Sequence, residues 1–155
     1  MRVTVFPLLF AALIPAAQAQ APDGRAVFNE QCAACHQPDA KGLPGNFPPL
    51  AGNPDLFLAR DFPVRVVLFG MTGKIEVLGQ TIDGVMPPIG ENLDDAQVAA
   101  VVNFVRGSFG NAALAPKPVA PVDAALVADL RRQHDTLGEA VHSYREQLKA
   151  AADKK

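Results

Sequence analysis

The sequence predicts an all-α protein, and three observations carry this prediction. Residues 98–105 place four valines on one helical stripe, which follows an acidic turn and ends near an arginine. Two apolar segments between residues 53 and 70 have proline and glycine where helices begin and end. Residues 127–148 repeat apolar side chains at spacings of three and four. These patterns favour a small body of short helices followed by a helical extension.

A C-x-x-C-H pentapeptide at residues 32–36 is the centre of this organisation. Cys32 and Cys35 can share one helical turn, and His36 follows directly. Two thiols at this spacing can both form thioether bonds to one porphyrin while the imidazole reaches its iron. We therefore expect one haem c, covalently attached through Cys32 and Cys35, with His36 as an axial ligand.

Other uses of the pentapeptide fit the chain less well. A thioredoxin-like pair follows a strand in a βαβ unit, and no such pattern is present in the sequence. A structural zinc site needs four ligands, but the chain has two cysteines, and its other histidines, His134 and His142, stand far along the sequence. A plain disulfide or a chance match is the remaining alternative.

The N-terminus predicts export. Arg2 leads into an apolar run that ends in the small-residue pattern at Ala19, so we expect residues 1–19 to be a signal peptide. The run is short for a membrane span and contains Pro7 and Pro15, which predicts no stable span after cleavage. The expected location is the bacterial periplasm, where c-type haem attachment and cysteine chemistry are compatible.

The segment after His36 is rich in glycine and proline. It cannot continue a helix, so residues 37–52 are expected to wrap over the haem. A metal-bound imidazole needs a partner for its second nitrogen. We expect the Pro48 carbonyl to be that partner, with Pro44 as the second candidate and a structural turn as the alternative, and Leu50 to cover one haem face.

A second segment with a candidate haem ligand runs from Gly84 to Gly90. Methionine opposite histidine gives a six-coordinate haem iron, and Met86 is followed by the stiff pair Pro87-Pro88. Met71 is the competing sulfur ligand, but the glycines that flank it would hold it less firmly. The other alternative is that Met86 is an ordinary core residue. We expect a break over residues 70–74 and extended chain at 75–78.

With these residues in place, the chain from about residue 22 to 110 resembles class I cytochromes c, which are small all-helical domains. The resemblance rests on the haem peptide, the Pro48-x-Leu50 loop, the Met86-Pro87 pair and the final helix. It implies a cytochrome c domain at 20–111 with one His–Met haem, whose metal ligands are His36 and Met86. Residues 86–90, 93–99 and 105–111 are also similar to cytochrome domains that serve periplasmic dehydrogenases, although Ile82 and Phe109 replace an aromatic residue and a tryptophan common there.

The chain changes character after Asn111. Residues 112–122 are a Pro/Ala-rich linker, expected to stay free of any core. Residues 123–155 predict one amphipathic helical tail, which either docks or dimerises through its apolar seam or remains a solvated tail. His134 and Gly138 weaken such a seam.

Function follows from these expectations. With 14 Lys and Arg against 16 Asp and Glu, the chain has no basic balance for nucleic acid. We expect an electron carrier rather than an enzyme, with Phe28, Leu50, Val67, Leu68 and Val101 around a dry haem. Its partner would be a periplasmic dehydrogenase, a terminal oxidase or a reductase. The alternative is a gas sensor or peroxidase-like haem enzyme with a displaceable Met86, which would bind external ligands.

Overall fold

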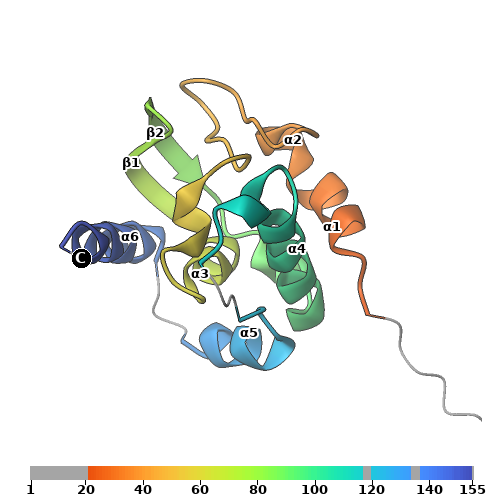
Figure 1. Ribbon diagram of the computed structural model, residues 1–155. Helices are drawn as coiled ribbons and strands as arrows, with labels where there is room; N and C mark the ends of the chain where they lie inside the picture. Colours follow the sequence, from red (N-terminus) through yellow and green to blue (C-terminus); the bar gives the residue numbers. More distant parts are fainter. Residues whose placement is uncertain (1–20, 117–119, 134–136, 155) are drawn as a thin grey trace, which may run out of the picture.

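The computed structural model describes residues 21–116, 120–133 and 137–154. The predicted signal peptide, the middle of the predicted linker and His134 lie outside these residues. Among the helices within them, none has the length and apolar character that a membrane crossing requires. Figure 1 shows short helices with one two-stranded hairpin at the side of the body, so the predicted helical body is confirmed.

Two helices, α1 (Gly24–Gln31) and α4 (Asp95–Gly107), pack together as the frame of this body. The contact is close, because a Cβ on Gly24 would lie 2.3 Å from the Ala100 carbonyl oxygen. Asp94 begins α4 with a capping box, in which its carboxylate accepts a backbone amide hydrogen at 2.7 Å. The valine stripe of α4 is buried, as its spacing predicts.

The chain between these helices forms η1 (Pro54–Phe57) and α3 (Phe62–Phe69), both with a proline in the first turn. The valine-rich segment is therefore a helix, as its punctuation predicts. Gly70 ends α3 with a φ of 72°, and a Cβ there would lie 2.4 Å from the Met86 carbonyl oxygen. The end of α3 thus contacts the backbone of the segment that contains Met86.

An antiparallel hairpin of β1 (Met71–Val77) and β2 (Gln80–Met86) follows α3 (Figure 1). The expected break over residues 70–74 is wrong from Met71 onward, because β1 begins there, whereas the extended chain expected at 75–78 is confirmed as far as Val77. The turn consists of Leu78 and Gly79, with φ of 51° and 73°. Two positive φ values give a tight turn that matches the twist of paired strands. Leucine is rarely found in such a turn, so the sequence carries no clear hairpin signal.

The C-terminal segment forms two helices, α5 (Ala124–Arg131) and α6 (Gly138–Ala152), instead of the single helix predicted. In Figure 1, α5 lies beside α4, and α6 lies beside the hairpin. Val127, Leu130 and Val141 belong to the predicted seam, and all three are buried within this chain. These three residues of the seam therefore pack on the chain's own body.

The predicted linker is fixed to the core where it reaches α5. Val122 is buried, and its amide and carbonyl both bond to the side chain of Asn103, at 2.9 and 2.7 Å. Arg60 donates to the carbonyl of Pro121. The expectation that the linker stays free of any core is wrong at this end, because its last residues supply backbone groups that the body binds.

Candidate haem site

The pentapeptide lies where α1 passes into α2 (Ala33–His36). The Cys32 carbonyl accepts the amide hydrogens of Cys35 and His36 at 3.2 and 2.9 Å, which sets all three side chains on one helical turn. Cys32 is buried and Cys35 is exposed. Burial, and then the neighbouring Cys35, raise the pKa of the free Cys32 thiol to about 11. Cys32 is therefore a neutral thiol before it reacts.

The His36 ring is held by the loop that follows it. Its Nδ1 lies 2.9 Å from the carbonyl oxygen of Pro48, the acceptor expected from the sequence. A carbonyl can only accept, so the proton is on Nδ1 and the lone pair of Nε2 is free for a metal. Burial lowers the pKa of His36, and the bond to Pro48 opposes this effect. Pro44, the second candidate, accepts from the Asn46 side chain instead.

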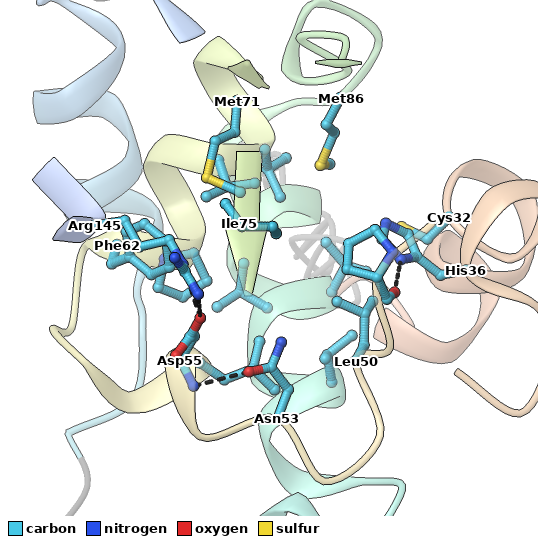
Figure 2. A pocket seen from close by; sticks show the side chains of 18 residues that line it. Cys32, His36, Leu50, Asn53, Asp55, Phe62, Met71, Ile75, Met86 and Arg145 are labelled. Carbon is cyan, nitrogen blue, oxygen red and sulfur yellow. Dashed lines mark hydrogen bonds and ion pairs between the residues drawn. The ribbon is translucent and has the colours of Figure 1, made fainter. Parts of the chain in front are cut away.

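The glycine- and proline-rich loop is folded back on itself beside the pentapeptide. The amides of Leu50 and Ala51 both donate to the carbonyl of Ala40, at 2.7 and 2.8 Å. Ala40 is fully buried and has a φ of 60°. This closed loop directs the side chain of Leu50 into the cavity described next (Figure 2).

A cavity of about 860 Å³, its open mouth included, lies between the pentapeptide, the loop, α3, α4 and the hairpin. Figure 2 shows Cys32 and His36 on one side of it and the hairpin methionines on another. Its wall is mainly apolar, with Leu50, Phe62, Val67, Ile75, Val101 and Val105 among the lining residues. A concave, mainly apolar site with a few converging polar groups is typical of sites that bind small molecules and cofactors.

Three of the five predicted lining residues, Leu50, Val67 and Val101, do line this cavity. Phe28 and Leu68 lie in the adjoining core instead. The ring of Phe28 packs against two other phenylalanine rings behind the pentapeptide. Apolar periodicity predicts burial but does not separate residues that face a cofactor from residues that face other side chains.

A second, smaller cavity continues the first on the other side of His36. Both cavities are lined by His36, Pro48, Met71, Ile75 and Met86. Cys32 lines the first cavity, whereas Cys35 lines the second. The two thiols therefore stand at the two parts of one slot: the buried Cys32 lines the larger part, and the exposed Cys35 lines the smaller part.

Both methionines of the described residues reach this slot. Met86 ends β2, and Met71, its partner across the hairpin, begins β1. In Figure 2 both side chains extend from the hairpin into the cavity, with His36 across from Met86. The sequence favoured Met86 as the sulfur ligand, and the structure brings Met71 to the same place.

One part of the cavity wall is polar, and no pattern in the sequence predicts it. Arg145 of α6 is 2% exposed and donates from Nε and Nη2 to Asp55 at 2.8 and 2.5 Å (Figure 2). A further bond joins Nη2 to the Glu76 carbonyl at 2.8 Å. Asn53 accepts the Asp55 amide hydrogen at 2.9 Å. Nothing in the local sequence marks Arg145, because its partners lie far away along the chain.

These residues fit a covalently bound haem. The slot is apolar, two thiols stand at its edge, and an imidazole and a thioether reach it from separate elements. Imidazole and thioether are the axial donors that haem iron takes in cytochromes c. The sequence pattern of the family described as cytochrome c matches residues 21–108.

The chain belongs to the cytochrome c family. Its cytochrome c domain therefore carries one c-type haem, bound covalently through Cys32 and Cys35. Among similar proteins, a cytochrome c-552 of Thermus thermophilus is 39% identical over 116 residues, which are 72% of this chain and 75% of that protein.

Two dehydrogenase subunits are also similar. The gluconate 2-dehydrogenase cytochrome c subunit of Pantoea cypripedii is 39% identical over 111 residues, 70% of this chain but 24% of that subunit. The cytochrome c subunit of the quinone-dependent alcohol dehydrogenase of Gluconobacter oxydans is 39% identical over 92 residues, covering 57% of this chain and 18% of that subunit. The cytochrome c domain thus resembles both a small cytochrome and part of larger subunits.

Proposed function

We propose that this protein is an exported single-haem electron carrier, with His36 and Met86 as axial ligands and a dehydrogenase as its electron donor. Electron transfer itself follows from membership of the cytochrome c family. One observation carries the ligand assignment. His36 and Met86 reach the same apolar slot from α2 and from the end of β2, so a donor is available for each axial position.

The chain holds both ligand side chains, His36 and Met86, in place through contacts of their own segments. The Pro48 carbonyl orients the His36 imidazole. The Pro87-Pro88 pair stiffens the backbone after Met86, and the close approach of Gly70 to the Met86 carbonyl fixes it from the other side. When bound, the haem supplies an iron that takes up and releases one electron. Two firmly mounted donors keep the coordination alike in both oxidation states and leave no open position for a substrate.

The slot wall sets the conditions for this exchange. Apolar side chains keep water away and disfavour additional positive charge, so they favour the reduced state and raise the reduction potential. The buried Arg145 and Asp55 carry opposite charges, and their ion pair adds little net charge to the wall.

The rim of the smaller cavity, beside the exposed Cys35, is the place for electron exit. Cys35, Phe47 and Val85 line the smaller cavity, and Phe47 and Val85 are 36% and 68% exposed. A redox partner that contacts this rim would approach the cofactor closely. The dehydrogenase subunits among the relatives support a dehydrogenase as donor, with a terminal oxidase or reductase as acceptor. The signal-like residues 1–19 support a periplasmic location.

We further propose the division of the chain that the sequence suggests, with the C-terminal helices packed on the domain. Residues 20–111 form the cytochrome c domain, residues 112–122 lead away from it, and residues 123–155 form a helical extension. Because α5 and α6 pack on the domain, the extension acts as part of the carrier.

The test begins with holoprotein exported through a c-haem maturation pathway. Visible spectra of the oxidised and reduced forms, and of the reduced form with carbon monoxide, are the measurement. A covalent low-spin haem with thioether ligation when ferric, inert to carbon monoxide, is expected. Rapid carbon monoxide binding would overturn the carrier and favour a sensor or a peroxidase-like enzyme. Reduction by gluconate or alcohol dehydrogenase preparations that lack their own cytochrome subunit then tests the donor.

A further inference from the structure

The register of the hairpin places two sulfur atoms on one face of the sheet. Met71 and Met86 are directly opposite each other in the antiparallel pairing of β1 and β2. Residues directly opposite in such a pair point to the same face, and their Cβ atoms are about 4.5–5.5 Å apart. The two thioethers therefore leave neighbouring points of the same surface.

That face is the one that closes the haem slot. Ile75 and Ile82, an opposed pair further along the hairpin, line the smaller cavity with the two methionines. Met71 and Met86 line both cavities together with His36. Methionine has an unbranched, flexible side chain, so sulfur atoms from neighbouring mounts can reach a common point.

Packing alone does not require sulfur at position 71. Met71 packs against the small cluster of Ile75, Val77 and Ile82, where leucine would fill a similar volume. The backbone of Met71 is also well fixed. It follows Gly70, whose backbone lies against Met86 and Pro87, so the two methionines are held in constant relation. The flanking glycines suggested that Met71 is held less firmly than Met86, but Met71 lies in a strand of fixed register.

We infer that Met71 is a reserve axial ligand, which binds the haem iron through its thioether when Met86 is lost or displaced. This inference rests on the proposed function, in which Met86 is the resident ligand. No atom changes its oxidation state in the exchange, because the bond from iron to the Met86 sulfur breaks and a bond to the Met71 sulfur forms. The consequence is a carrier whose sixth coordination position stays closed to small external ligands.

The test compares four holoproteins: the unaltered chain, Met71→Leu, Met86→Ala, and the variant with both substitutions. Two quantities are measured, namely the ferric absorption band of haem–thioether ligation and the affinity of the reduced form for carbon monoxide. M86A should keep the thioether band, because alanine leaves room for the Met71 side chain. The double variant should lose the band and bind carbon monoxide at least about tenfold more tightly than M86A, the factor expected if Met71 occupies nine-tenths of the sites.

The controls separate this inference from the proposed function. Met71→Leu should retain the band of the unaltered chain, because Met86 remains bound. If M86A lacks the band and binds carbon monoxide as tightly as the double variant, the reserve ligand is excluded while the His36–Met86 carrier stands. A missing band in the unaltered chain would remove the proposed ligation itself. Should M86A fail to fold, Met86→Leu against its M71L partner repeats the comparison with the volume conserved.

Discussion

The two helices of the C-terminal extension are attached to the body in different ways. Helix α5 buries Val127 and Leu130 in the main apolar core. Helix α6 buries Val141, but its other buried side chain is Arg145, which is paired with Asp55 in the haem cavity wall. Helix α5 is thus attached through apolar side chains and through Arg131, which bonds to Asp95 and to the carbonyls of Gly90 and Leu93. In contrast, Arg145 of α6 reaches the cofactor site.

Further polar contacts attach α6 to the body. On α6, the His142 ring bonds to the Lys74 carbonyl at 2.8 Å, and the Tyr144 hydroxyl donates to Asp61 at 3.0 Å. An apolar repeat at spacings of three and four runs through both helices, and it is silent about these polar contacts. The comparison teaches that such a repeat locates a buried stripe, while neighbouring polar residues decide what the stripe is attached to.

The largest expected effect comes from breaking the polar attachment. Arg145→Ala should lower the free energy of unfolding by about 3–5 kcal/mol, because Asp55 would remain buried without its main partner. Chemical unfolding of the holoprotein, followed by circular dichroism, measures this. Because Arg145 lines the cavity, the reduction potential should shift as well.

Two further variants control this prediction. Glu146, a half-exposed partner of Arg145, should cost only about 0–1 kcal/mol when replaced by alanine. A double variant, Arg145→Met with Asp55→Asn, should recover much of the loss, because it removes both buried charges. An R145A variant no less stable than E146A would contradict the importance of the buried pair.

A smaller effect is expected from the apolar attachment. Val127 is fully buried, and Val127→Ala should cost about 2 kcal/mol, from two lost methyl groups and the space they leave. The reduction potential should not change, since Val127 does not line the haem cavity. Leu137→Ala is the matched control in the same predicted seam; at 68% exposed, it should stay within about 0.5 kcal/mol of the unaltered chain. A shift in potential for V127A would show that α5 also acts on the cofactor site.

The smallest effect is expected from Tyr144→Phe, and it depends on pH. The bond to Asp61 is worth about 0.5–1.5 kcal/mol near neutral pH. Desolvation, and then the charge of Asp61, raise the pKa of the Tyr144 hydroxyl above its ordinary value of 10.0. A raised folded-state pKa stabilises the folded chain fully below pH 10 and loses this effect as the pH rises through the higher value. Unfolding curves of the two proteins should therefore differ at pH 8 and converge at higher pH; a constant difference would rule out the titration of Tyr144.

The sequence predicts well those features that neighbouring residues determine. Spacing within the pentapeptide fixes one helical turn, and the Pro48 carbonyl lies where the loop was expected to bring it. The acidic turn before the valine stripe contains Asp94, which caps α4 with a full capping box. Each of these features depends on interactions over a dozen residues or fewer.

The missed features depend on contacts between distant segments. The hairpin turns at Leu78-Gly79, where an exposed leucine adopts a positive φ despite the contact of its Cβ with the backbone. Arg145 meets Asp55 across 90 positions of sequence. Gly138, counted as a weakness within one long helix, instead begins α6 and allows the backbone to approach Thr72. None of these outcomes has a local pattern that distinguishes it from the alternatives.

The position of Arg145 in the haem cavity also bears on the order in which the protein matures. A chain is made from its N-terminus, so Cys32 and Cys35 emerge long before α6 exists. Until α6 docks, the slot lacks the part of its wall that Arg145 supplies. Docking of α6 after haem attachment would therefore close the site around the bound group.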